Sequence, residues 1–271
     1  MPFIQWLGMI LLIVLALLTI IPFLWMVSAS FKANNEVFTI PIQWIPKTWH
    51  LENYLVIWSR IPLVTFFKNT AFLSVVITLI QLFTSSFAVY GFSELNFKGR
   101  DILFLAYIGT IAVPWQSYMI PQFIMMRKVG LTYTLWSLVL LQAFNAFGVF
   151  LLKQYYSSIP DSLCESARID GLSEWEIYRK IILPLTKPAI ASLTIITFVN
   201  TWNDYMGPFI YLSSTENKTI QLGLKMFIGL FDAEYALIMA ASVVSVLPVA
   251  FIFLAMQKYF VEGIASSGMK E

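Results

Sequence analysis

The stretch DSLCESARIDGLSEWEIYRKIILP, residues 161–184, places charged and small side chains in the middle of an otherwise apolar chain. Its opening residues favour a helix N-terminus, and Gly171 is a natural stop for that helix. Ser173 followed three residues later by Glu176 is a capping box that starts a second helix. The stretch is therefore predicted to form two short helices joined by a turn, with Pro184 ending the second helix.

The rest of the chain is apolar enough to cross a membrane several times. Hydrophobic residues make up 59% of the 271 residues and charged residues 12%, which is about half the charged fraction of soluble proteins. A bilayer core ~30 Å thick needs about 20 residues of helix. The sequence predicts an all-α integral membrane protein with six transmembrane helices, expected at residues 4–30, 66–93, 102–126, 134–153, 187–210 and 235–258.

The polar segments of the chain lie between these predicted spans, at residues 31–64, 154–186 and 211–234. Lys and Arg residues divide almost evenly between the two sides of the membrane, so their distribution does not fix the orientation. No Gly-, Ser- or Pro-rich linker separates one part of the chain from another. We therefore expect one transmembrane domain, 1–271, that includes the amphipathic loop 154–186.

Two interpretations of segment 154–186 follow from residue chemistry alone. A short helix outside the membrane with charged and small residues side by side forms a docking surface for another protein. The alternative is an amphipathic loop that lies at the membrane interface without a partner.

Several functional classes are disfavoured by composition. A net charge of +2 without a basic cluster does not suggest a nucleic-acid partner. One histidine, His50, cannot form a His-based metal cluster, and we expect no metal site. Cys164 is the only cysteine, so neither a disulfide nor an evident catalytic constellation is available. The chain is not expected to be an enzyme.

Polar residues recur at helical spacing within two predicted spans. One stripe comprises Thr70, Ser74, Thr78, Gln81 and Ser85, and the other Thr194, Thr197, Thr201 and Asp204. Such stripes either pack helices together or line a translocation path. Asp204 is the only carboxylate close to a span, and it either takes part in the path or contacts lipid headgroups at the end of its helix.

The cluster around Asp204 has the chemistry of a sugar site, because amides and a carboxylate hydrogen-bond hydroxyls while Trp202 or Tyr205 can stack on a sugar ring. Gln142 and Asn145 are weaker candidates of the same kind. The candidate substrate-path residues are Asn200, Trp202, Asn203, Asp204, Asn145 and Gln142.

The segment resembles the cytoplasmic "EAA" loop of ABC-importer permeases. That loop has Glu-Ala-Ala, three residues, Gly, nine residues and Ile-x-Leu-Pro, and here Glu165-Ser166-Ala167, Gly171 and Ile181-Ile182-Leu183-Pro184 keep every spacing. Ser166 for the middle Ala is the one departure, and Ser is small enough to preserve packing. Further stretches, including Phe67-Lys68-Asn69-Thr70 and Trp202-Asn203-Asp204, are similar to carbohydrate-importer permeases of the maltose/multiple-sugar type, in particular to the second, shorter permease of the pair.

This resemblance implies the type I ABC importer permease fold, with six transmembrane helices and a cytoplasmic coupling helix in loop 154–186. The ATPase-coupling residues it implies are Glu165, Ser166, Ala167, Arg168, Asp170, Gly171 and Pro184. Gly171 would permit a sharp turn, and Arg168 could pair with an acidic group on the ATPase.

The resemblance also implies partners and a location. They are a second permease subunit in a heterodimer, an ATPase dimer that carries ATP and Mg, an extracytoplasmic solute-binding protein and membrane lipid. The chain itself has no phosphate-binding Gly-rich loop. A cytoplasmic coupling loop places both termini of this multi-pass protein on the cytoplasmic side of a bacterial inner membrane. The function implied is import of a sugar or oligosaccharide.

Two alternatives remain open at this point. One is a permease of the same type for a non-sugar solute such as glycerol-phosphate. The other is a secondary transporter or channel, which would need ion-coupling acids at mid-span, whereas only Asp204 is near a span.

Overall fold

A computed structural model describes residues 2–229 and 232–268, with side chains described for residues 5–229 and 232–258. Helices dominate the described chain, and the only pairing of extended residues within it is one isolated bridge between Ile228 and Ala233. The all-α prediction is therefore confirmed.

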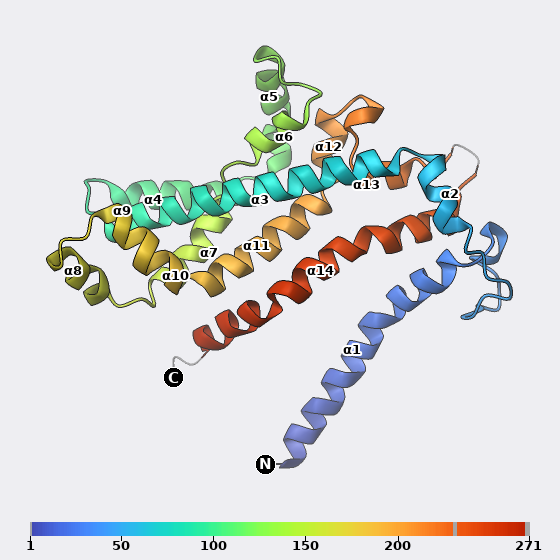
Figure 1. Ribbon diagram of the computed structural model, residues 1–271, viewed down its shortest axis with the longest axis horizontal. Coiled ribbons are helices and arrows are strands. Elements are labelled where there is room, and N and C mark those ends of the chain that lie inside the picture. The colour runs from blue at the N-terminus through green and yellow to red at the C-terminus, as the bar shows by residue number, and fades with distance from the viewer. Residues whose placement is uncertain (1, 230–231, 269–271) are drawn as a thin grey trace. The chain divides into compact units, whose positions relative to one another are not determined.

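Three helices are long and apolar enough to cross a membrane without interruption. They are α1 (Pro2–Ser30), α3 (Leu63–Glu94) and α14 (Tyr235–Gly268), drawn in Figure 1. Their bounds contain the predicted spans 4–30, 66–93 and 235–258, and α14 continues ten residues beyond the prediction. These spans are correctly predicted because hydrophobic length alone defines them.

The helix predicted at 102–126 is instead a pair of helices bent by 100°. Helix α4 (Arg100–Gly109) continues into the 3₁₀ turn η2 (Thr110–Ala112), and α5 (Trp115–Lys128) follows. Pro114 separates the two, since it has no backbone N–H and forces the preceding residue into an extended conformation. The prediction of one continuous helix over 102–126 is wrong here.

The other two predicted spans are broken as well. Helices α6 (Leu135–Leu141) and α7 (Ala146–Tyr156) replace the helix predicted at 134–153 and are bent by 42°. Residues 203–205 divide the helix predicted at 187–210 into α11 (Lys187–Trp202) and α12 (Met206–Tyr211). The third bent pair joins residues Glu174–Leu185 to α11 at 76°, and if each bent pair is one span, the described residues contain up to six spans.

The remaining described elements are short. They are η1 (Asn34–Glu36), α2 (Asn53–Arg60), α8 (Asp161–Ile169), α9 (Glu174–Ile177), the π-helical turn η3 (Tyr178–Ile182), α10 (Leu183–Leu185), η4 (Thr215–Asn217) and α13 (Ile220–Lys225).

The chain divides into two compact units, Met1–Phe66 with Ile220–Pro248, and Phe67–Thr219 with Val249–Glu271. The first unit contains an ion pair between Arg60 and Glu234 at 3.0 Å. In the second unit α3 runs beside α11, and the Thr197 hydroxyl donates a hydrogen bond to Gln81 of α3 at 3.2 Å (Figure 1).

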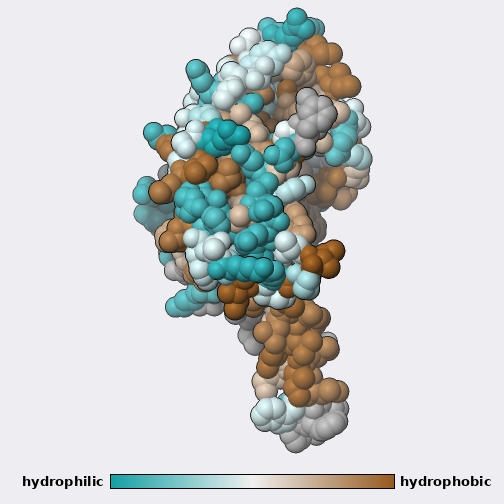
Figure 2. Space-filling model, turned by 90° about the vertical axis from the view of Figure 1, so that its right-hand side faces the viewer, coloured by the Kyte–Doolittle hydropathy of each residue, from teal (hydrophilic) through white to brown (hydrophobic). Residues whose placement is uncertain are grey.

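Large hydrophobic side chains are exposed on many of the helices. The most apolar stretch of α1 buries none of its residues within the chain, and Figure 2 shows wide brown areas on the surface. A soluble protein would not expose so much apolar surface, whereas helices that face lipid or another membrane subunit must.

Candidate functional site

The segment 161–184 forms the two helices that its sequence predicts. Helix α8 ends at Ile169 with Asp170 as its C-cap, and Gly171 takes a left-handed conformation with φ of 82°. The Leu172 N–H then bonds the Ala167 carbonyl at 3.0 Å, which completes a Schellman motif. Ser173 and Glu176 form the predicted capping box at the start of α9.

The second helix does not end at Pro184 as predicted. The chain passes from α9 through the π-helical turn η3 into α10, and Pro184 lies within α10. A wider π-helical turn just before a proline relieves the clash between the ring and the preceding carbonyls. Thr186 then ends the run by bonding the Ile182 carbonyl at 3.0 Å, and the chain bends by 76° into α11.

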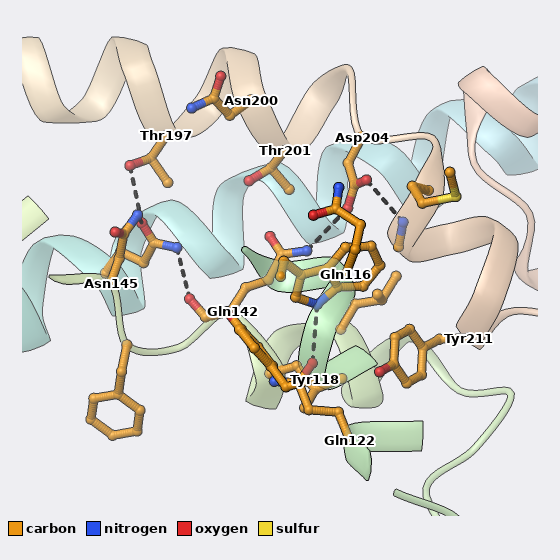
Figure 3. Close-up of a pocket in the computed structure, with 17 residues that line it drawn as sticks. Gln116, Tyr118, Gln122, Gln142, Asn145, Thr197, Asn200, Thr201, Asp204 and Tyr211 are labelled. Atoms are coloured by element: carbon orange, nitrogen blue, oxygen red, sulfur yellow. Dashed lines mark hydrogen bonds between the residues drawn. The ribbon is translucent and has the colours of Figure 1, made fainter. Parts of the chain in front are cut away.

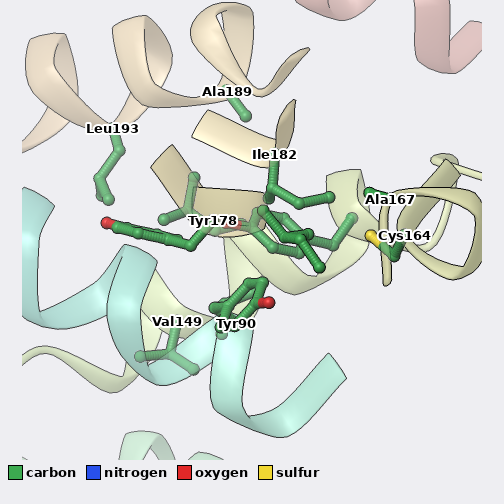
Figure 4. Packing of buried hydrophobic residues seen from close by; sticks show 12 residues of the cluster. Tyr90, Val149, Cys164, Ala167, Tyr178, Ile182, Ala189 and Leu193 are labelled. Carbon is green, nitrogen blue, oxygen red and sulfur yellow. The ribbon is translucent and has the colours of Figure 1, made fainter. Parts of the chain in front are cut away.

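Helix α8 has one face packed on its own chain. Cys164 and Ala167 are buried in a cluster that also contains Tyr90, Tyr178 and Ile182 (Figure 4). This cluster attaches α8 to the C-terminal end of α3 and to the helix that leads into α11.

The opposite face of α8 is open. Glu165, Ser166 and Asp170 are exposed there, and Ile169 keeps 86% of its surface exposed. Small, charged and apolar side chains therefore lie side by side on one open face, which is the arrangement that the docking interpretation requires. The exposed face thus fits the docking interpretation.

Arg168 joins the two helices of the segment. Its Nε donates to Glu174 Oε1 at 2.8 Å, and its Nη2 donates to the backbone carbonyl of Glu94, at the end of α3, at 3.4 Å. The Tyr90 hydroxyl donates to the other oxygen of Glu174 at 2.5 Å. Arg168 is thus paired within its own chain, where the sequence-based expectation gave it a partner on the ATPase.

The pKa values of Glu174 and Cys164 are shifted in this region. The Arg168 guanidinium and the Tyr90 hydroxyl lower the pKa of Glu174 below its ordinary value, because they stabilise the carboxylate. Burial, assisted by Glu94, raises the pKa of the Cys164 thiol to about 12. Cys164 is therefore a buried, unreactive packing residue.

A polar cavity of about 390 Å³ lies among α3, α5, α11 and the helix breaks (Figure 3). Gln142 and Asn145 flank the break between α6 and α7, and Asp204 lies in the break between α11 and α12. The Gln142 amide donates to Asp204 Oδ2 at 3.1 Å, and the Gly207 N–H donates to Asp204 Oδ1 at 3.0 Å. A hydrogen bond thus joins the two breaks.

A second set of hydrogen bonds ties the cavity to α3. Asn145 Nδ2 donates to Gln81 Oε1 at 3.0 Å, and Gln81 Nε2 donates to the Gln142 carbonyl at 2.7 Å. Thr197 shares the same Gln81 oxygen. Breaks in helices free backbone groups that must find partners within the membrane, and these side chains supply them.

Four of the six predicted path residues line the cavity: Gln142, Asn145, Asn200 and Asp204. Trp202 does not, because its ring is buried between Phe198 and Phe67, with centroid distances of 5.5 and 5.9 Å. Asn203 caps the C-terminus of α11 and also lies outside the lining.

The sequence reasoning missed the contribution of α5. Trp115, Gln116, Tyr118 and Gln122 all line the cavity, and the Trp115 indole donates to Gln122 at 3.0 Å. Two glutamines inside a predicted span were an available signal, since polar residues in a span face protein or water.

Comparison with known proteins identifies the family. The family described as "Binding-protein-dependent transport system inner membrane component" matches residues 1–266. The arabinooligosaccharides transport system permease protein AraQ of Halalkalibacterium halodurans is 32% identical, over 99% of this chain and 98% of that protein.

Two further relatives match over nearly their whole length. The polygalacturonan/rhamnogalacturonan transport system permease protein YtcP of Bacillus subtilis is 32% identical, over 96% of this chain and 95% of that one. The lactose transport system permease protein LacG of Rhizobium radiobacter is 31% identical, over 93% and 92%.

Solved structures agree with the predicted type I ABC importer permease fold. A chain of a bacterial ABC transporter involved in the import of the acidic polysaccharide alginate superposes with a TM-score of 0.84 at 26% identity, over 96% of this chain and 97% of that chain. With family and relatives matching almost end to end, the chain belongs to the inner membrane components of binding-protein-dependent transport systems, the permeases of ABC transporters.

Proposed function

We propose that this chain is one of two permease subunits of an ATP-driven importer and carries a sugar or oligosaccharide delivered by a solute-binding protein. The observation that carries the proposal is α8, with one face buried in the chain and an exposed face that bears the coupling-motif residues Glu165, Ser166, Asp170 and Gly171. The permeases for arabinooligosaccharides and lactose among its relatives support a saccharide as cargo.

In this proposal the exposed face of α8 docks on the ATPase subunit in the cytoplasm, which holds ATP and Mg. Movement of α8 is passed on through two routes. The Arg168–Glu174–Tyr90 hydrogen bonds lead to α3, and the buried cluster around Cys164 and Tyr178 leads to the helix before α11. Both α3 and α11 contribute to the wall of the polar cavity.

The cavity is the part of the proposed translocation path that this chain supplies. Its amides and hydroxyls can hydrogen-bond sugar hydroxyls, and its volume is within the ~300–1,000 Å³ range of small-molecule sites. The second permease would complete the path in a heterodimer. Both termini lie in the cytoplasm when α8 does, and the solute-binding protein docks on the opposite side.

The docking assignment is tested by changing α8 without changing its buried face. We expect Gly171→Val and Glu165→Arg each to lower ATP-dependent sugar uptake by about tenfold or more, with the assembled complex still in the membrane. Gly171 holds a φ that side chains rarely adopt, and Glu165 lies on the exposed face. Uptake and ATP hydrolysis would be measured with the reconstituted complex.

Lys98→Glu is the matched control, because it reverses an exposed charge in the loop before α4, outside α8 and away from the face on which the solute-binding protein docks. It should leave uptake close to the wild-type rate. Unchanged uptake and unchanged stimulation of ATP hydrolysis in both α8 variants would show that α8 is not the coupling site.

A further inference from the structure

Within the part of the chain that the structure describes, the only charged side chain in the cavity wall is a carboxylate. Asp204 is its only ionisable acid, and no lysine, arginine or histidine is among the described residues that line it. The other polar lining groups are amides and hydroxyls. A ligand in contact with this wall would meet one carboxylate and no opposing cation.

An anionic ligand needs compensation that this wall does not supply. Carboxylate and phosphate groups that leave water are bound by Arg or Lys, or by backbone N–H groups at helix N-termini. The N–H of Gly207 in the first turn of α12 is already taken by Asp204 Oδ1. This N–H is therefore not free to donate to a ligand, and the carboxylate of Asp204 would repel an anion.

The same wall suits an uncharged polyol. Asn200 and Gln116 are exposed in the cavity and present both donors and acceptors. Tyr118 and Trp115 add aromatic faces on which a sugar ring can stack. The hydroxyl groups of a sugar bind to paired donors and acceptors that carry no net charge. The amides and hydroxyls of this wall supply such donors and acceptors.

We infer that the cargo of this importer is an uncharged saccharide, not a uronic-acid oligosaccharide or a sugar phosphate. The inference rests on the proposed function and narrows its substrate class. It separates this chain from its structural neighbour that imports the acidic polysaccharide alginate. It also disfavours glycerol-phosphate, an anion, as the cargo.

The test uses two saccharides that differ only at C6, which is a carboxylate in trigalacturonate and a hydroxymethyl group in its carboxyl-reduced counterpart, α-1,4-galactotriose. Binding of each to the purified complete importer in detergent would be measured by titration calorimetry at low and moderate salt. We expect the neutral trisaccharide to bind at least about tenfold more tightly, with a difference that shrinks as salt screens the repulsion.

Variants of the cavity wall test whether its charge, and not another part of the complex, causes the preference for the neutral trisaccharide. Asp204→Asn should reduce the preference for the neutral trisaccharide by about fivefold. Gln116→Lys, which adds a cation at an exposed lining position, should shift the preference in the same direction without touching Asp204. Asp101→Asn, an exposed carboxylate outside the cavity, is the control and should leave the preference unchanged.

Equal or tighter binding of trigalacturonate to the wild-type importer would overturn the inference and leave a saccharide permease in place. So would an unchanged preference in both wall variants. If neither trisaccharide bound the complex, the inference would be overturned, because the wall would show no affinity for an uncharged polyol of this size; the α8 variants would still decide the proposed function separately.

Discussion

Protonation of Glu174 should weaken the attachment of α8 to α3. Glu174 accepts from Arg168 and Tyr90, and these partners lower its pKa. A carboxyl group whose pKa is depressed in the folded state stabilises that state above its unfolded value of about 4.3, and the contribution is lost as pH falls through the folded value. The attachment of α8 to α3 should therefore be intact near pH 7 and weaken below about pH 4.

Cys164 reports on this attachment, because it is the only cysteine and lies on the buried face of α8. We expect its reaction with 4,4′-dithiodipyridine, normalised to free cysteine at each pH, to be slow at pH 7 and to accelerate below pH 4. Glu174→Gln should raise the rate at pH 7 by about fivefold, since a partly exposed ion pair contributes up to about 1 kcal/mol.

Glu165→Gln is the control for this experiment, because Glu165 lies on the exposed face of α8 outside the network. It should keep the slow reaction at pH 7. A rate at pH 7 that is the same in Glu174→Gln and in the wild type would show that the ion pair does not hold α8.

Among the elements, α3, α7 and α11 pack against one another at Gly148 of α7. A Cβ added there would lie 2.6 Å from Ser85 Oγ and 3.3 Å from the Leu193 methyl groups. Gly148→Ala should destabilise the protein by about 1–3 kcal/mol, because overpacking forces backbone or side chains to shift. The midpoint of denaturation of the detergent-solubilised protein would measure the change.

The same substitution at Gly91 is the matched control. Gly91 lies inside α3, and an added Cβ meets nothing within 4 Å. Alanine should therefore be neutral or stabilise the helix there by up to about 1 kcal/mol. A Gly148→Ala protein as stable as the wild type would mean that the three helices can separate without cost.

The structural elements that depend only on residues close together in the sequence were predictable from it. The capping box at Ser173 and the left-handed stop at Gly171 depend on residues within one turn, and both form as expected. The uninterrupted spans α1, α3 and α14 follow from hydrophobic length alone. The break at Pro114 also had a local signal, but hydropathy averaged over a window gives no information about a bend.

The candidate site was predictable only in part, because its members meet through tertiary packing. Gln142, Asn145 and Asp204 were singled out as polar groups near spans, and the cavity contains them. Trp202 belongs to the same cluster in sequence, yet Phe67 and Phe198 enclose its ring. No pattern along one helix reveals which of its faces another helix will cover.

At the scale of the whole molecule, contacts within the second compact unit sort the ends of the spans into two groups. Lys153 donates to the Phe92 carbonyl at 3.0 Å and Arg168 to that of Glu94, which groups the end of α3 with α8. Asn69 donates to the Lys218 carbonyl at 2.9 Å and Asn217 to that of Tyr133 at 2.7 Å, which groups the opposite ends.

This grouping is the one that six membrane crossings require, since alternate connections must emerge on the same side. If α8 is cytoplasmic, residue 98 is cytoplasmic and residue 216 is extracytoplasmic. In a Cys164→Ser background, Glu216→Cys should react with a membrane-impermeant maleimide in spheroplasts, whereas Lys98→Cys should react only after permeabilisation; both positions are exposed. The background variant alone should remain unlabelled. The reversed pattern would place α8 outside the cell, where no ATPase could dock, and would remove the basis of the proposed coupling.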